Sequence, residues 1–265
     1  MSADGEGCAG SRRSGGGRLG LRQRPMSLAR LARLREATYR ILSQSFLFPG
    51  EEHLRGVAAA ARDLRASGSP LIRFAFFEQW SRLLGLLEEC DRAGRQRFQE
   101  QYTSLFAASS GGVPCPPYES AYRDPVGGST GWLLAQVERE YASAGLALSR
   151  DSGELPDLVS VEMEFVAVLC GREAQAWERE DRRQAVDLLG RQQSFLDSHL
   201  ARWLPEFGER VRAADSDGMY AALCEGAQVF IGYDVDLLGV LLETFGEPDE
   251  VDSEGERRRA RGDPR

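Results

Sequence analysis

The sequence predicts an all-α protein, a single helical domain of roughly nine to twelve helices. Apolar residues recur at i, i+3 and i+4 through most of the chain, which is the spacing of one helix face. No segment alternates with a period of two for long enough to form a strand, and no repeat of fixed period is present. A hydrophobic content of 42% in 265 residues supplies enough material for one sizeable core.

The domain is expected to span residues 27–245, with both ends of the chain outside it. Residues 1–26 are mostly Gly, Ser and Arg with almost nothing to bury, so a disordered arm is predicted. Residues 246–265 are predicted to form a charged, flexible tail. The Ser-Arg-Arg at 11–13 superficially resembles an export signal, but glycines follow where such a signal needs an apolar stretch. Met26 is an alternative start codon.

The N-terminal half contains four predicted helices. The first begins after Ser27, a good N-cap residue, and ends before Pro49. The second runs from Glu51 to Ala66, and a third is predicted across residues 71–87. A fourth, short helix follows the break at Gly94 and presents four apolar or aromatic side chains: Phe98, Tyr102, Leu105 and Phe106.

The helical pattern stops in a stretch rich in Gly and Pro, residues 107–129, and resumes at Gly131. A second non-helical joint is predicted over residues 149–156. Three longer helices follow, with a short segment after Pro205 linking the last two. Their predicted bounds are Pro156–Trp177, Arg182–Trp203 and Asp217–Phe245.

The composition excludes several classes of function. All 33 basic residues are Arg, and the formal net charge is -8. This negative charge argues against a nucleic-acid binder and suits a basic partner. No apolar run approaches the length of a membrane span, so no membrane insertion is expected. The five Cys lie far apart without a CxxC pair, and the chain has two His. This pattern is typical neither of a disulfide framework nor of a metal site. The expected location is the cytoplasm.

No known catalytic template is present: the chain lacks a GxxxxGK[ST] phosphate loop, a GxSxG elbow and an HExxH pair. We therefore predict no catalytic residue, no metal ligand and no cofactor. His199 falls on the apolar face of the helix predicted over 182–203, two residues after Asp197, whereas di-iron bundles use Glu-x-x-His. A core histidine with one hydrogen-bond partner is the favoured interpretation over a ligand.

Two carboxylates, Glu162 and Asp234, fall on apolar helix faces, where an unpaired acid is rare. One interpretation is a structural ion pair or the cap of a neighbouring helix end. The other is an anionic floor for a groove that receives a cationic peptide.

The stretch at 107–129 is the best candidate site, because long loops inside compact helical domains tend to be functional. Two consecutive prolines at 116–117 stiffen the backbone and present Tyr118 and Tyr122, while Glu119 and Asp124 add negative charge. The alternative is an ordinary turn whose tyrosines cover the core.

Four segments, in their order, spacing and helical context, resemble the TorD/DmsD family of helical cytoplasmic chaperones, the redox enzyme maturation proteins. They are YTSLF at 102–106, CPPYESAY at 115–122, LPDLVSVEMEF at 155–165 and FLDSHLARW at 195–203. The second and third are most similar to chaperones of the type II DMSO-reductase group, whose clients include dimethylsulfide, ethylbenzene, selenate, chlorate and nitrate enzymes.

The resemblance implies a TorD-like fold and a chaperone that is not an enzyme. Such a protein binds the twin-arginine signal peptide and the apo form of a molybdopterin-containing catalytic subunit, aids insertion of the cofactor and delays export until then. The implied partners are that subunit and its leader peptide, with no nucleic acid, and a homodimer is compatible with the sequence.

The expected peptide-binding region combines the positions that the resemblance carries over with nearby aromatic and acidic residues. Carried over are Leu105, Phe106, Pro117, Tyr118, Ser120 and Asp157; added are Glu119, Tyr122 and Glu162. Two guanidinium groups and an apolar run require carboxylates and an apolar groove. Tyr118 stands where many members have Trp. Asp157-Leu158 stands where the family commonly has Asp-His, so guanine-nucleotide binding, described for some members, does not carry over.

Three functions compete. The leading one is a binding protein that turns over no substrate, the second a weak nucleotide hydrolase, and the third a helical adaptor whose client is not a molybdoenzyme. The absent phosphate loop counts against the second.

Overall fold

The computed structural model describes residues 27–66, 81, 85, 92–107, 112–123, 130–149, 153–215 and 218–246. Within these ranges it contains nine helices and no strand, which confirms the all-α prediction. The N-terminal arm, almost all of the predicted helix at 71–87, Asp124 and the tail beyond Gly246 lie outside the described residues. The predicted domain limits therefore stay predictions.

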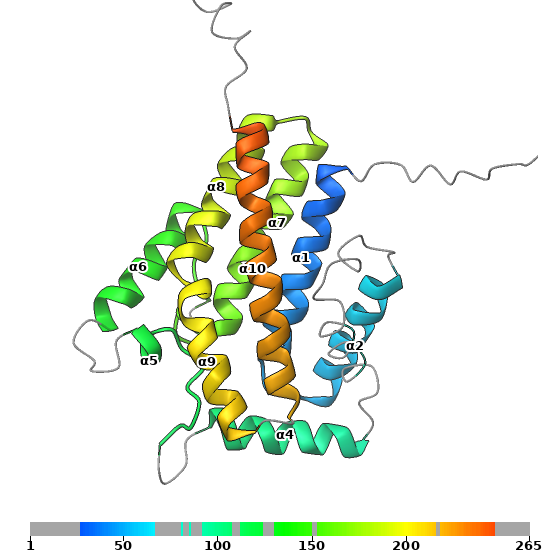
Figure 1. Cartoon of the computed structure of the whole chain (residues 1–265), viewed down its shortest axis with the longest axis vertical. Helices are drawn as coiled ribbons and strands as arrows, with labels where there is room; N and C mark the ends of the chain where they lie inside the picture. Colours follow the sequence, from blue (N-terminus) through cyan, green and yellow to red (C-terminus); the bar gives the residue numbers. More distant parts are fainter. Residues whose placement is uncertain are drawn as a thin grey trace, which may run out of the picture.

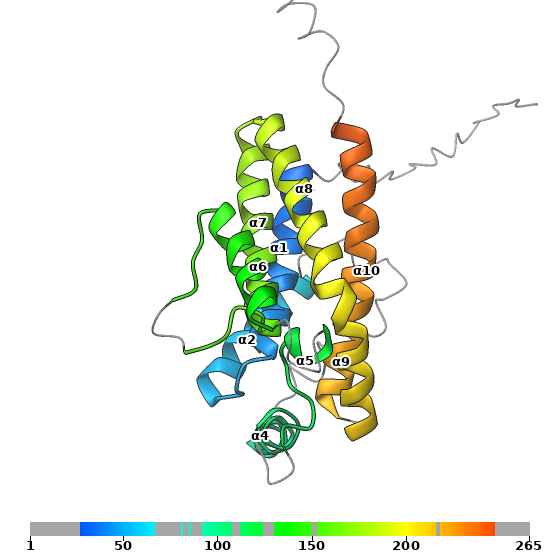
Figure 2. The ribbon, with the colours of Figure 1, turned by 90° about the vertical axis from the view of Figure 1, so that its left-hand side faces the viewer.

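The nine helices form an elongated bundle with a cross-piece at one end (Figure 1). Helix α7 packs between α1 and α8, and α10 packs against α8 and α9. Helix α4 lies across the lower end of the bundle in Figure 1 and is seen end-on, below the other helices, in Figure 2. The bounds are α1 Leu28–Ser45, α2 Glu51–Ala66, α4 Arg92–Phe106, α5 Ser120–Arg123, α6 Thr130–Ser143, α7 Val159–Glu178, α8 Arg182–Ser198, α9 Leu200–Ala214 and α10 Met219–Phe245.

Several predicted boundaries are confirmed and rest on local chemistry. The Ser27 hydroxyl accepts a hydrogen bond from the Arg30 backbone N–H at 3.2 Å, so Ser27 caps α1 as expected. Asp181 caps α8 in the same way, through the N–H of Gln184 at 3.0 Å. Helix α2 has the predicted bounds. Helix α7 starts three residues later than predicted, because Pro156 and the residue after it form a turn.

Two predictions about the C-terminal helices are wrong. The helix expected over 182–203 is broken at His199, which ends α8 and precedes α9. Pro205 lies inside α9 rather than in a linker, and the helix continues to Ala214. The missing N–H of Pro205 costs one backbone bond, but α9 buries a strongly apolar face that outweighs this loss. Its buried side chains are Leu200, Trp203, Leu204, Phe207 and Val211.

Two smaller corrections concern the middle of the chain. Helix α4 begins at Arg92, two residues before the predicted break at Gly94. The loop predicted without regular structure at 107–129 contains the single-turn helix α5, whose first residue is capped by a side chain from a distant segment.

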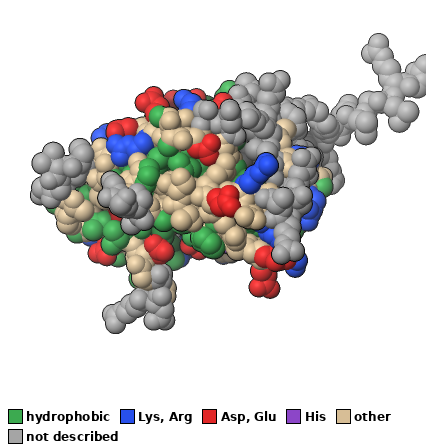
Figure 3. All heavy atoms as spheres, turned by 90° about the horizontal axis from the view of Figure 1, so that it is seen from below, with side chains coloured by type: hydrophobic (Ala, Val, Ile, Leu, Met, Phe, Trp, Pro, Cys, Tyr) green, Lys and Arg blue, Asp and Glu red, His purple; other side chains and the backbone are tan. Residues whose placement is uncertain are grey.

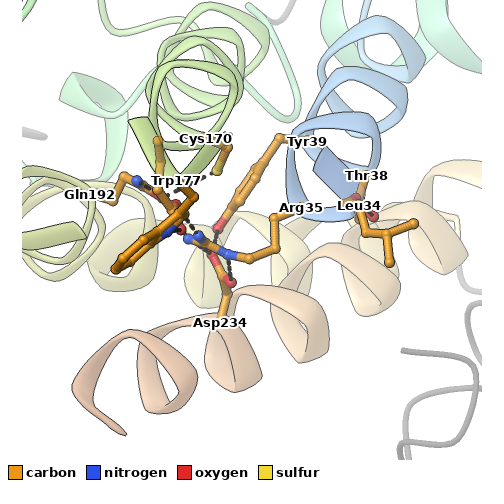
Figure 4. A network of polar contacts seen from close by, with 9 residues as sticks. Leu34, Arg35, Thr38, Tyr39, Cys170, Trp177, Gln192 and Asp234 are labelled. Atoms are coloured by element: carbon orange, nitrogen blue, oxygen red, sulfur yellow. Dashed lines mark hydrogen bonds and ion pairs between the residues drawn. The ribbon is translucent and has the colours of Figure 1, made fainter. Parts of the chain in front are cut away.

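A buried ion-pair network joins α1 to three other helices (Figure 4). The Arg35 guanidinium pairs with Asp234 on α10 and with Glu173 on α7 at 2.7 Å, and it donates to Gln192 on α8 at 2.6 Å. Tyr39 also donates to Asp234, at 2.8 Å. The side chains of Arg35 and Asp234 are at most 1% exposed. Asp234 therefore belongs to a structural ion pair, as in the first of the two interpretations drawn from the sequence.

Two features are absent from the described residues, a membrane-spanning helix and a cluster of metal-ligating side chains. None of their helices is both long and apolar enough to cross a membrane. No group of three or more His, Cys, Asp or Glu among them is placed to hold a metal ion.

Candidate functional site

We call residues 115–123 the clasp; they include α5, which packs against α6 and α9. The clasp is tied at its start to α4, because the Cys115 N–H donates to the Leu105 carbonyl at 2.9 Å. Cys115 is fully buried and so anchors the two prolines that follow it. The first two of the four similar segments, 102–106 and 115–122, thus meet through the backbone.

The clasp pairs with the start of α7. The Val159 N–H donates to the Pro117 carbonyl at 2.9 Å, and the Glu119 N–H donates to the Asp157 carbonyl at 3.0 Å. These bonds flank an isolated antiparallel bridge between Tyr118 and Leu158. The third similar segment, 155–165, is thereby brought beside the second.

Asp157 closes the turn before α7 and also caps α5. Its Oδ2 accepts the Ser120 N–H at 3.0 Å, which satisfies the first backbone donor of that short helix. Its side chain is fully buried, and Oδ1 has no hydrogen-bond partner within the described structure. Asp157 therefore acts on the clasp from inside the protein.

A side-chain link joins the clasp to the break between α8 and α9. His199 Nδ1 lies 2.7 Å from Glu119 Oε2, and both side chains are 0% exposed. Arg123 donates to Glu119 Oε1 at 2.5 Å and to the Ser198 carbonyl at 2.6 Å. The second bond satisfies a carbonyl at the C-terminus of α8. His199 is a core histidine with one hydrogen-bond partner among the described residues, as predicted.

Glu162 lies below the clasp in the first turn of α7. Its Oε2 accepts the Trp203 indole N–H at 3.1 Å, and the side chain is fully buried. Burial and the negative charge of Glu119 raise the pKa of Glu162 well above its ordinary value, although the hydrogen bond from Trp203 acts in the opposite direction. The raised pKa favours the protonated, neutral form of Glu162.

The pKa of Glu119 is shifted in the opposite direction. Burial alone would raise the pKa of Glu119, but the hydrogen bonds and positive charges of His199 and Arg123 outweigh burial and lower it. The carboxylate accepts from both side chains, from Arg123 at Oε1 and from His199 at Oε2. The fourth similar segment, 195–203, thus joins the other three at one place.

Aromatic rings pack behind the clasp. Tyr122 stacks on Trp203 with ring centres 5.5 Å apart, and the Arg210 guanidinium lies 4.8 Å from the centre of the Tyr122 ring. Phe106 packs edge-on to Tyr220 at 4.9 Å. Tyr122 and Phe106 are 7% and 8% exposed, so they support the clasp from the core side.

All nine residues predicted for the peptide site lie in or beneath the clasp, but they differ in exposure. Tyr118 and Ser120 are half-buried and reach the surface. The other seven are buried: Leu105, Phe106, Pro117, Glu119, Tyr122, Asp157 and Glu162. The predicted anions therefore lie inside the protein, where they hold the clasp.

A groove of about 420 Å³ opens beside the clasp, between the end of α1, residues 146–149 and the start of α7. Leu158, the partner of Tyr118 in the bridge, lines it. The exposed carboxylates Glu154 and Glu164 line it too. The remaining wall is mostly apolar and includes Leu47, Leu146, Leu148, Val161, Phe165 and Val168.

Exposed aromatic side chains continue this surface toward α4. Phe48 is 55% exposed, and its ring centre lies 5.5 Å from that of Tyr102. Burial, Glu154 and Tyr118 raise the pKa of Tyr102, in keeping with their proximity. Figure 3 shows this end of the molecule, where apolar and acidic side chains lie side by side on the surface.

Three residues of this surface were not predicted from the sequence as candidate site residues: Phe48, Glu154 and Glu164. A signal for Phe48 was available, because a large aromatic residue directly before the helix-ending Pro49 has no helical face on which to be buried. The two glutamates carried no comparable signal, since exposed acids are common in this chain.

The chain is similar to known proteins over the part that contains the candidate site. The family model described as nitrate reductase delta subunit matches residues 72–209, which contain all four segments. The selenate reductase assembly chaperone protein of Thauera selenatis is 34% identical over 139 residues, 52% of this chain and 69% of that protein. The chlorate reductase assembly chaperone protein of Ideonella dechloratans is 33% identical over 141 residues, 52% and 70% of the two chains.

More distant similarities agree. A chaperone protein TorD of Vibrio cholerae is 33% identical over 128 residues, 48% of this chain and 56% of that protein. A crystal structure described as a redox enzyme maturation protein from Archaeoglobus fulgidus superimposes with a TM-score of 0.50 at 23% identity. It covers 74% of this chain and 93% of the other, which supports the all-helical, TorD-like fold.

Proposed function

Because the chain belongs to the nitrate reductase delta subunit family of TorD-like assembly chaperones, we propose that it is an assembly chaperone for a molybdopterin oxidoreductase. It binds the apo form of the catalytic subunit in the cytoplasm, aids insertion of the cofactor and delays export until insertion is complete. It does so by binding and does not catalyse a reaction.

The client is recognised through its twin-arginine leader, and the observation that carries this proposal is the surface formed by the clasp and the groove. An apolar wall with two exposed carboxylates matches a peptide that combines guanidinium groups with an apolar run. Glu154 and Glu164 pair with the arginines, because they are the acids of the site that water reaches. The apolar run packs on Leu158 and its neighbours.

The predicted site residues divide into two roles. Tyr118 and Ser120 contact the leader at the edge of the groove. The buried members shape that edge: Asp157 and Glu119 hold the clasp, and Glu162 supports Glu119 from below. Leu105, Phe106, Pro117 and Tyr122 complete the support.

The charge of the whole protein favours such a partner. A net charge of -8 attracts a cationic peptide and raises its association rate at low salt. The apolar wall contributes the part of the affinity that salt does not screen.

Isothermal titration calorimetry with synthetic leaders tests the proposal. The probes are the twin-arginine leaders of a selenate and of a chlorate reductase catalytic subunit, each with a twin-lysine version. We expect one-to-one binding that weakens for the lysine versions, because lysine cannot pair bidentately with a carboxylate. Absence of binding for both leaders, at protein concentrations up to about 1 mM, which corresponds to about 4 kcal/mol, would overturn the proposal.

A further inference from the structure

The Glu119–His199 contact connects the clasp to the joint between α8 and α9. Apart from α5 the clasp has no regular structure, and its backbone bonds run to α4 and to the start of α7. Among the described residues, Glu119 and Arg123 are the clasp residues that link it to α8, α9 or their joint through a buried charge. Of these links, the bond to His199 is fully enclosed.

Glu119 and Tyr118 are adjacent and have opposite surroundings. Tyr118 is paired with Leu158 in the bridge and remains half-buried, whereas Glu119 is 0% exposed. In extended backbone, successive side chains point to opposite sides. Holding Glu119 inside therefore turns Tyr118 outward, toward the surface beside the groove.

Glu119 is held strongly. Its carboxylate accepts from His199 Nδ1 at 2.7 Å and from Arg123 at 2.5 Å. Turning the side chain out of this environment would leave buried donors without an acceptor, which is costly. The clasp thus has one favoured register relative to α7.

His199 is itself fixed in place. Its N–H donates to the Phe195 carbonyl at 2.9 Å, and its carbonyl accepts the Arg202 N–H at 2.8 Å. Its ring lies 4.7 Å from the Phe195 ring, centre to centre. The helix break at His199 is therefore what brings Nδ1 to Glu119, rather than into the apolar stripe of a continuous helix.

We propose that His199 is a positioning residue for client binding: its Nδ1–H bond to Glu119 sets the register of the clasp and so the outward orientation of Tyr118. The role in client binding rests on the proposed function. The orientation of the clasp does not, and it is measured separately below.

Two substitutions separate the bond from the mere presence of a polar side chain. The amide nitrogen of Asn overlays Nδ1 of histidine, whereas that of Gln overlays Nε2, so His199→Asn retains the donor to Glu119 and His199→Gln displaces it. Hydrogen exchange of the Glu119 and Val159 amides reports the register of the clasp relative to α7, because both amides form hydrogen bonds between the clasp and the start of α7. Amides in the middle of α7 and α10 are the internal control.

We expect the Glu119 and Val159 amides to exchange about tenfold faster or more in His199→Gln, with the amides in the middle of α7 and α10 unchanged, and near-wild-type exchange in His199→Asn. Leader affinity, measured with the selenate and chlorate reductase leaders, should fall by about tenfold in His199→Gln and recover in His199→Asn. Glu119→Gln, which keeps the shape but not the charge, should resemble His199→Gln and replaces it if that variant does not fold.

Equal exchange in wild type and His199→Gln would overturn the proposal, and so would equal losses in the Asn and Gln variants, which would assign His199 a packing role only. Wild-type clasp exchange combined with no leader binding by the wild-type protein would overturn the proposed function. In that case the amide exchange of the variants still decides the register.

Discussion

The indole of Trp203 on α9 donates a hydrogen bond to Glu162 on α7 at 3.1 Å, and both side chains are enclosed in the core. The other carboxyl oxygen has no hydrogen-bond partner within the described structure, and burial and the negative charge of Glu119 raise the pKa of Glu162 well above its ordinary value. A raised pKa favours the protonated acid over an anion that could pair with a guanidinium group of the leader.

Glu162→Gln should leave leader affinity within about twofold of wild type, because glutamine reproduces the donor and acceptor of a neutral acid. An anionic contact would instead lose much of its affinity on this change. Calorimetry with the twin-arginine leaders is the measurement.

The same variant should alter how stability depends on pH. Unfolded, Glu162 loses its proton near 4.5, whereas its raised pKa keeps the proton on in the folded state. Between these values the unfolded state binds fewer protons, so the free energy of unfolding falls as pH rises. Glu119 acts oppositely: its contribution is present above about pH 4.5 and is lost as pH falls through its lowered pKa. Denaturant melts between about pH 5 and 8 should show Glu162→Gln gaining on wild type as pH rises; parallel profiles would contradict this assignment.

Tyr118→Ala should weaken leader binding by about 2 kcal/mol, the cost typical of removing an aromatic anchor from an interface. Its thermal midpoint should change little, because Tyr118 is half-buried at the surface. Tyr233→Ala, which removes a 39% exposed tyrosine from α10, is the matched control and should leave affinity unchanged. Equal affinities for the two variants would remove Tyr118 from the site.

Glu154→Gln and Glu164→Gln should each lower the affinity for the twin-arginine leader by about two- to fivefold at low salt, as expected for exposed ion pairs. The loss should shrink as ionic strength rises, because salt screens exposed charges. Glu138→Gln, an exposed acid on α6, is the control. A loss that persists at high salt would indicate that these acids act through the fold rather than through charge.

Arg35→Met should destabilise the protein by about 3–5 kcal/mol, because it leaves the buried carboxylates of Asp234 and Glu173 without their cation. Arg33→Met on the same helix removes an exposed pair with Glu178 and should cost about 1 kcal/mol or less. Urea unfolding of both variants gives the comparison. Similar costs would mean that the network is not the stabilising feature of α1.

Removing residues 1–26 and 247–265 should shift the thermal midpoint by less than about 2 °C and leave leader affinity unchanged. The reason is their composition, which offers little apolar surface to bury. Differential scanning calorimetry and titration of the shortened chain are the measurements. A loss of several degrees would show that one end packs on the domain.

Much of the fold could be predicted because helices depend on contacts near in sequence. The apolar spacing, the Ser27 cap and the bounds of α2 are local features, and all three are confirmed. The same argument explains the error at His199: apolar spacing continues through Trp203, so periodicity contains no sign of the break. The partner that stabilises His199 there, Glu119, lies 80 residues earlier.

The sequence by itself determined the fold class, the family through four ordered segments, and the region of the candidate site. Only the tertiary structure decided what the acids of that region do. Asp234 is paired with Arg35, 199 residues away, while the pKa of Glu162 is raised and that of Glu119 is lowered although both are buried glutamates. The physical reason is that the ionisation of a buried acid is set by its desolvation and by the donors around it, and these come from segments that only folding brings together.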